Sequence, residues 1–141
     1  MTNDSISIFT DGGSRGNPGP AASAFIIYDS SNTTLHQHGF YLGIATNNQA
    51  EYQAVIEALK YIRDTLYEIH NTNFYLDSEL VVKQLRGEYK IKDPNLQTKS
   101  QEIKNIIFLL PSNSVRFTHV PREQNSAADA LVNKTLDSLS S

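Results

Sequence analysis

The sequence contains no cysteine among its 141 residues. Disulfides, cysteine-ligated zinc and thiol nucleophiles are therefore excluded, and any bound metal must use oxygen or histidine ligands. Hydrophobic residues make up 39% of the chain, and no hydrophobic run approaches the length of a membrane span. The opening residues, MTNDSIS, have neither the basic region nor the apolar core of a signal peptide. We therefore expect a cytoplasmic protein.

An excess of positive charge is also missing, because 12 lysines and arginines face 15 aspartates and glutamates, which gives a formal net charge of −3. This balance argues against nucleic-acid binding that depends on net charge alone. The bases from 83 to 104 nevertheless outnumber the acids there; they are Lys83, Arg86, Lys90, Lys92, Lys99 and Lys104. A solvated surface is the commoner meaning of such a run, and a nucleic-acid contact is the alternative.

No repeat, low-complexity stretch or shift in composition marks a linker, so we expect a single domain over residues 1–141. Three strands joined by short turns are predicted first, and strands and helices alternate after them. The predicted strands are 5–11, 21–28, 35–42, 73–77 and 115–120, and the predicted helices are 49–66, a short one after Ser78, 96–110 and one beginning at Asn125 or Ser126. This order predicts an α/β fold with a mixed sheet and helices on its faces.

Four acidic residues stand where such a fold gathers ligands. Asp11 ends the first strand and Asp77 ends the fourth, and parallel strands place such ends at one edge of the sheet. Glu51 lies one helical turn before Val55 and so on the inward side of its helix, and Asp129 lies in the first turns of the last helix. An Asx turn is the alternative for Asp11, and complementing the helix dipole is the alternative for Glu51.

Four converging carboxylates would repel one another unless cations were bound between them. Oxygen ligands with open water positions suit Mg²⁺ or Mn²⁺. Two such ions about 4 Å apart can hold a phosphodiester, one activating water and the other stabilising the leaving oxygen. The acids therefore indicate phosphoryl chemistry, with a structural Ca²⁺ site as the alternative.

Four segments together resemble ribonuclease H type 1 over nearly the whole chain. They are TDGGSRGNPGP (10–20), TNNQAEYQAVIEAL (46–59), LDSELVVKQLRG (76–87) and HVPREQNSAADALVN (119–133). The resemblance implies a five-stranded mixed sheet of order 3-2-1-4-5 with helices on both faces. It also implies endonucleolytic cleavage of the RNA strand of RNA/DNA hybrids, leaving 3′-hydroxyl and 5′-phosphate ends.

The resemblance further implies which acids hold metal. Asp11 would bridge two Mg²⁺ ions, with Mn²⁺ as a substitute; Glu51 and Asp77 would complete one site, and Asp129 would serve the other. Because all four acids are present, we expect an active enzyme. A non-catalytic nucleic-acid-binding module within a larger assembly is the alternative, and a phosphoesterase acting on double-stranded RNA or structured single strands is another.

The family also places a mobile histidine about ten residues before the last aspartate, where it assists proton movement and product release. His119 stands at that spacing. The following VPRE segment makes Arg122 a competitor for the role. The structural alternative for His119 is a histidine at the edge of a strand that is hydrogen-bonded to backbone.

Substrate contacts are implied for five more residues. Gly12, Asn17, Asn47 and Asn48 match positions beside the minor groove of the hybrid, where the 2′-hydroxyl distinguishes RNA from DNA. Thr46 matches a position that holds a DNA phosphate, and turn or capping duty is the alternative for these side chains.

Two departures from longer relatives accompany the resemblance. No extra helix with an aromatic and basic protrusion is predicted between Gly87 and Leu96, and no separate N-terminal hybrid-binding domain is apparent. We therefore expect weaker and more salt-sensitive hybrid binding. We expect a monomer that needs no protein partner.

Overall fold

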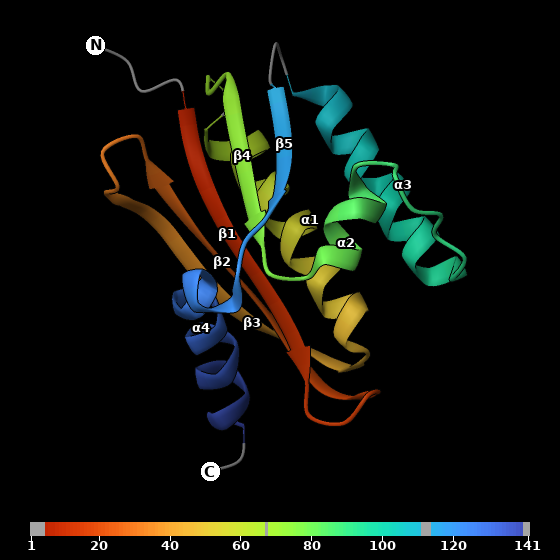
Figure 1. Cartoon of the computed structure of the whole chain (residues 1–141). Helices are drawn as coiled ribbons and strands as arrows, with labels where there is room; N and C mark the ends of the chain where they lie inside the picture. The colour runs from red at the N-terminus through yellow and green to blue at the C-terminus, as the bar shows by residue number, and fades with distance from the viewer. Residues whose placement is uncertain (1–4, 67, 111–113, 140–141) are drawn as a thin grey trace.

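The computed structural model of the chain describes residues 5–66, 68–110 and 114–139. Figure 1 shows the five strands and the helices of these residues. The strands are β1 (Ser5–Ser14), β2 (Gly19–Asp29), β3 (Thr34–Ala45), β4 (Asn71–Leu76) and β5 (Ser114–His119). The helices are α1 (Asn47–Thr65), α2 (Glu79–Leu85), α3 (Pro94–Leu109) and α4 (Ser126–Asp137), with a short 3₁₀ helix η1 (Arg122–Asn125) directly before α4.

The strands form one mixed sheet in the order β3-β2-β1-β4-β5. β1 pairs antiparallel with β2 and β2 antiparallel with β3, whereas β4 runs parallel to both β1 and β5. The predicted mixed sheet, its strand order and its parallel connections are therefore confirmed. The parallel pairs place the C-terminal ends of β1 and β4 beside each other.

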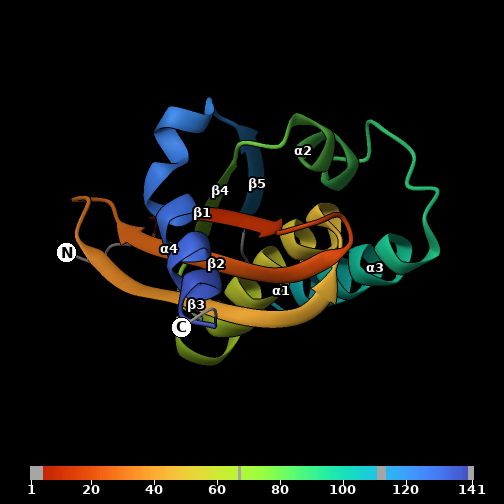
Figure 2. The same cartoon turned by 90° about the horizontal axis from the view of Figure 1, so that it is seen from below.

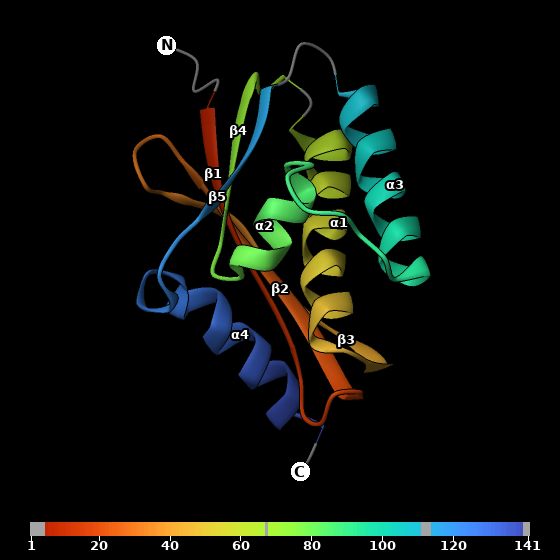
Figure 3. The same cartoon turned by 45° about the vertical axis from the view of Figure 1, so that its right-hand side comes forward.

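Helices cover both faces of the sheet, as predicted. α1 and α3 lie on one side and α4 lies on the other, as Figure 3 shows. α4 lies across β1, β2 and β3, which is visible from below in Figure 2. Within the described residues, no helix is long and apolar enough to cross a membrane.

The core on the α1 side explains where α1 sits. Ile6 and Ile8 of β1 are almost fully buried against the helix, and so are Leu59 and Ile62 of α1. Burying each such aliphatic side chain contributes about 1.5–3 kcal/mol relative to leaving it exposed. This packing fixes the rotation of α1 and turns the residues one turn before Val55 toward the sheet.

The core on the α4 side uses smaller residues. Ala22 and Ala24 of β2 pack against Val132 and Leu136 of α4. Gly39 of β3 has no room for a side chain, because a Cβ there would lie 2.6 Å from the hydroxyl of Thr135. The small residues let α4 approach the sheet closely, and its first turns therefore reach the end of β1.

Most predicted element boundaries differ from the structure by a few residues, and the differences in β1 and α1 lie beside the acids. β1 extends beyond residue 11 to Ser14 because its glycines keep pairing with β2. α1 begins at Asn47, since Thr46 forms a capping box with Gln49, in which each side chain bonds the other residue's backbone N–H. η1 was not predicted. The segment 86–93 contains no helix, which agrees with the predicted absence of a protrusion there.

Candidate metal and catalytic site

Asp11 and Asp77 come from neighbouring parallel strands that separate at their C-terminal ends. The last β1–β4 pair is Phe9 with Tyr75, and each strand reaches its aspartate two residues later. Asp11 is 7% exposed and remains paired with Ala24 of β2. It therefore sits within a strand, and the Asx-turn alternative is wrong.

Glu51 enters the site from α1, where the helix backbone approaches the strand closely. A Cβ on Gly12 would lie 2.3 Å from the carbonyl carbon of Ala50 and 2.5 Å from the backbone nitrogen of Glu51. The hydroxyl of Ser23 donates to the carbonyl of Ala50 at 2.6 Å. This contact between helix and strand requires glycine after Asp11 and carries Glu51, 6% exposed, beside it.

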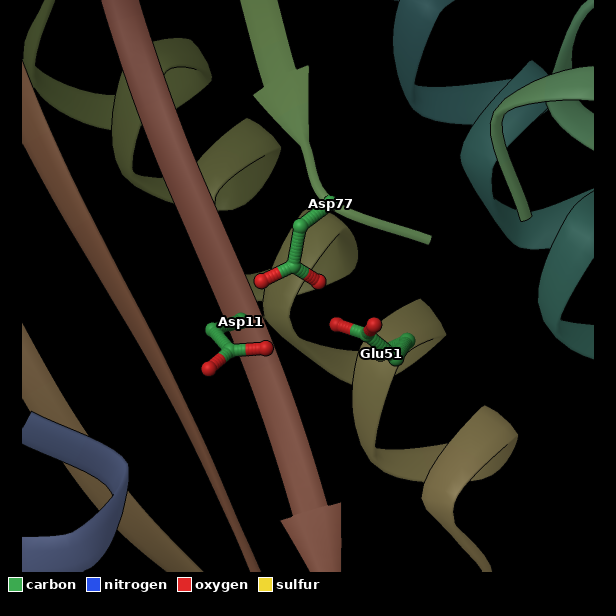
Figure 4. A group of neighbouring side chains, drawn as sticks. All are labelled: Asp11, Glu51 and Asp77. Carbon is green, nitrogen blue, oxygen red and sulfur yellow. The ribbon is translucent and has the colours of Figure 1, made fainter. Parts of the chain in front are cut away.

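The carboxylates of Asp11, Glu51 and Asp77 face one another, as Figure 4 shows. One oxygen from each lies within 4.8 Å of the other two. The predicted convergence of these three acids is therefore a feature of the structure. The dipole-only alternative for Glu51 does not hold, because its side chain points inward to the other acids.

Burial and mutual repulsion disfavour ionisation of the two buried acids. Burial raises the pKa of Asp11 to about 8, and the charges of Asp77 and Asp129 also raise it. A hydrogen bond from the backbone N–H of Gly12 lowers the pKa and offsets part of this effect. Burial also raises the pKa of Glu51 well above its usual range, with further contributions from Asp11 and Asp77. These two carboxylates need a positive charge nearby to stay ionised at neutral pH.

Asp129 lines the same cavity from α4. It is exposed in the first turn of α4 and close enough to Asp11 to raise the pKa of that residue. The cavity has a volume of ≈ 390 Å³. Its lining includes all four predicted acids together with Gly12, Asn47, Asn48, Arg15 and Arg122.

Arg122 and His119 are placed differently relative to this cavity. Arg122 lines it from η1. His119 is the last residue of β5, is exposed, and lies outside the cavity lining. The structure therefore brings Arg122, but not His119, to the wall that the acids share.

The predicted substrate residues form a small network beside the acids. The backbone N–H of Asn47 donates to Oδ1 of Asn17 at 3.0 Å, and Oδ1 of Asn47 accepts from the backbone of Ser14 at 2.8 Å. The hydroxyl of Thr46 accepts from the backbone of Gln49 at 3.1 Å. The two asparagine oxygens thus hold the loop after β1 against the start of α1, which Thr46 caps, while Asn47 and Asn48 line the cavity.

The site fits a divalent cation. All its candidate ligands are carboxylate oxygens, which hard cations such as Mg²⁺ and Mn²⁺ prefer. Oε1 of Glu51 is buried and has no hydrogen-bond partner, and leaving such an acceptor unpaired is costly. A cation held by Asp11, Glu51 and Asp77 would satisfy that oxygen and offset the repulsion.

Comparisons with known proteins identify the family of the chain. The model of the reverse transcriptase-like family matches residues 9–135. The crystal structure of LC11-RNase H1 in complex with an RNA/DNA hybrid is 42% identical, covers 96% of this chain and 99% of that one, and superposes with a TM-score of 0.91. The chain belongs to the ribonuclease H type 1 family.

Two curated relatives of this ribonuclease H chain are longer proteins. Ribonuclease HI of Halobacterium salinarum is 39% identical over 94% of this chain and 64% of its own length. A bifunctional protein of Mycobacterium tuberculosis is 34% identical over 94% of this chain and 35% of its own length. The chain thus spans about two thirds of the first relative and about a third of the second.

Two residues of the ribonuclease H site were missed in the sequence. Arg15 lines the cavity and binds Asp137 of α4 at 2.5 Å, and a lone arginine in a glycine-rich turn gives no signal for such a partner. Asn125 is 1% exposed, and its amide nitrogen donates to Oδ2 of Asp77. Its position before a helix predicts only a cap.

Proposed function

We propose that the chain is an endoribonuclease that hydrolyses the RNA strand of RNA/DNA hybrids and leaves 3′-hydroxyl and 5′-phosphate ends. The observation that carries this proposal is the convergence of Asp11, Glu51 and Asp77 within 4.8 Å, with Asp129 on the same cavity. A close relative has been crystallised with an RNA/DNA hybrid, which supports the choice of substrate. The intact acid set favours an enzyme over a binding module.

The four acids would hold two divalent ions, Mg²⁺ or Mn²⁺. Asp11 lies between the other acids and is suited to contact both ions, Glu51 and Asp77 would complete one site, and Asp129 would serve the other. When bound, the two ions supply an activated water and neutralise the charge on the leaving oxygen. The chain's own contribution is to preorganise the carboxylates, because two of them are fixed in the core before any ligand arrives.

The network beside the acids would receive the minor groove of the hybrid. Gly12 presents backbone without a side chain, and the free faces of Asn17, Asn47 and Asn48 can bond base edges and 2′-hydroxyls. Thr46 stands at the N-terminus of α1, where backbone N–H groups favour a phosphate. The side-chain oxygens of Asn17 and Asn47 already bond protein backbone, so their amide nitrogens are the groups we assign to the substrate.

Arg122 is our choice for the group that assists product release, because it lines the cavity and His119 does not. A guanidinium stays charged at any physiological pH, so Arg122 would bind the negative phosphate rather than carry a proton. His119 would then be dispensable. We also propose that the chain works as one domain and as a monomer, since all four acids come from a single chain. A cytoplasmic location stays a prediction.

The deciding experiment compares matched RNA/DNA, RNA/RNA and DNA/DNA duplexes of one sequence with Mg²⁺ or Mn²⁺. We expect cleavage of the RNA strand in the hybrid alone, with 5′-phosphate products identified by end-labelling. Asp11→Asn is the control for a contaminating nuclease. Absence of hybrid cleavage with either metal by the wild-type chain would refute the proposal.

The Arg122 assignment is tested separately by comparing Arg122→Ala with His119→Ala at saturating metal. We expect kcat to fall about tenfold for Arg122→Ala, which corresponds to losing one charge-assisted hydrogen bond of about 1.5 kcal/mol. His119→Ala should stay within about twofold of the wild type. The reverse pattern would assign the role to His119.

A further inference from the structure

Asn125 does not perform the task that its position predicts. It is the N-cap residue of α4, yet its side chain makes no capping hydrogen bond. An asparagine at this position ordinarily accepts a stabilising bond from a backbone N–H of the first turn. The side chain is buried, with 1% of the residue exposed, so its amide is used elsewhere.

The amide nitrogen of Asn125 points toward the strands that carry the acids. Nδ2 donates to the backbone carbonyl of Thr10 at 2.8 Å and to Oδ2 of Asp77 at 3.4 Å. Thr10 directly precedes Asp11 and lies just beyond the last pair between β1 and β4, Phe9 with Tyr75. The amide therefore fills the place where the two strands separate and bridges the backbone beside one acid to the carboxylate of another.

The oxygen of the Asn125 amide lowers the stability of the fold. Oδ1 of Asn125 is buried without a hydrogen-bond partner, and a buried unpaired acceptor destabilises the folded state. A residue selected for stability alone would not leave a buried oxygen unpaired and the helix without a side-chain cap. Local rules are broken in this way mainly where a side chain serves a site.

We propose that Asn125 is a positioning residue for the acid cluster. Its two donor contacts hold the carboxylate of Asp77 and the backbone beside Asp11 in a fixed relation, while its own backbone begins the helix that carries Asp129. One side chain thus ties three of the four acids together. This inference rests on the proposed function, because it assigns Asn125 to the metal-binding carboxylates.

The size of the effect follows from the behaviour of groups that orient metal ligands. Removing such a partner typically costs 10–100-fold in metal affinity or activity. We expect Asn125→Leu, which keeps the volume but has no donor, to weaken Mg²⁺ binding about tenfold and to lower kcat by a similar factor. KM for the hybrid should change little, because Asn125 is buried and does not face the substrate.

The test uses isothermal titration of the full chain with Mg²⁺ in the absence of substrate, followed by hybrid cleavage kinetics. Asn125→Ser is the second variant: serine is a favoured N-cap residue and is too short to keep both contacts, so it preserves folding if Asn125→Leu does not. Ile106→Ala is the matched control, since Ile106 is buried on α3 outside the cavity lining and its truncation lowers stability alone.

The inference is supported if both Asn125 variants bind Mg²⁺ about tenfold more weakly while Ile106→Ala binds it like the wild type. It is overturned if the Asn125 variants bind Mg²⁺ within about twofold of the wild type and lose only thermal stability. The titration needs no nucleic acid, so a wild type that cleaves no hybrid would refute the proposed function and leave this measurement interpretable.

Discussion

The four acids of the cavity divide into a buried pair and a more accessible pair. Asp11 and Glu51 are 7% and 6% exposed and are held by β1 and by the packing of α1. Asp77 is half-buried and Asp129 is exposed. The difference shows which acids lower the stability of the metal-free fold. The buried pair is desolvated and repels its neighbours before any ligand binds, whereas the accessible pair stays hydrated.

The buried pair therefore ties folding to function in opposite directions. Fixing two carboxylates in advance favours metal binding, because no reorganisation is needed. The same two carboxylates destabilise the metal-free chain whenever both are ionised. The accessible pair contributes charge to the cavity at little cost to folding, so substitutions in the two pairs should differ in stability as well as in activity.

Asp11→Asn should have the largest effect, because it removes one charge of the buried pair. A neutral amide is a weaker ligand for divalent cations than a carboxylate, so we expect hybrid cleavage to fall by at least about 10³-fold in kcat. Because the neutral side chain removes the repulsion, the metal-free variant should also melt higher than the wild type at pH 9. Cleavage kinetics and calorimetric melting in EDTA measure the two effects. A variant that is inactive and also less stable would contradict our account of the buried pair.

Gly12→Ala should damage the buried pair without changing any charge. The new methyl group would meet the backbone of Ala50 at 2.3 Å, so α1 must move and carry Glu51 with it. We expect a loss of about 2–3 kcal/mol in the free energy of unfolding, typical of overpacking against backbone, and a fall in kcat. Urea unfolding measures the stability.

Gly13→Ala is the matched control for that substitution. Its nearest neighbours would be side-chain atoms at 3.8 Å and 3.9 Å, which are ordinary van der Waals contacts. It should therefore stay within about 0.5–1 kcal/mol of the wild type. Equal destabilisation by the two substitutions would show that general loss of strand geometry, rather than the close approach of α1, governs this turn.

Asp129→Ala should have a smaller effect, because this acid is exposed. We expect kcat to fall about 10- to 100-fold while the melting temperature in EDTA changes by no more than about 2 °C, as for most surface substitutions. Ser126→Ala, also exposed in the first turn of α4, is the control for the helix itself. A loss of activity equal to that of Asp11→Asn would remove the distinction between the two pairs.

The acids could be predicted from the sequence because each stands at a position that periodicity defines. Asp11 and Asp77 end apolar strands, and Glu51 interrupts the inward stripe of a helix. Four segments that resemble one family fixed the strand order. The bonds of Asn125 could not be predicted in this way, because they depend on where β1 and β4 separate, which only the assembled sheet defines.

The same limit explains the choice between His119 and Arg122. Spacing in the sequence favours His119. It does not show that β5 ends at His119 or that Arg122, at the start of η1, lines the cavity. The close approach of α1 to Gly12 is likewise visible only in three dimensions. Local patterns predict which residues carry the chemistry, whereas the contacts that position them arise between distant segments.

The stability of the metal-free chain should also depend on pH. The pKa of Asp11 is raised from 3.8 to about 8 in the folded metal-free chain, so the folded state binds more protons than the unfolded state within that interval. Its contribution to stability is therefore complete below pH 3.8 and is lost as pH rises through about 8. We expect the melting temperature in EDTA to fall between pH 6 and pH 9, by about 3–6 °C for each 1 kcal/mol of stability that is lost.

Saturating Mg²⁺ should flatten that decline, because a bound cation restores ionisation of the buried pair and stabilises the folded state by mass action. Asp11→Asn in EDTA should show a shallower decline than the wild type, and Asp129→Ala should decline almost as steeply as the wild type. Calorimetry of the three proteins in EDTA over this pH range, repeated for the wild type with Mg²⁺, makes the comparison. A wild-type melting temperature that rises with pH in EDTA would show that repulsion within the buried pair does not limit the stability of the metal-free chain.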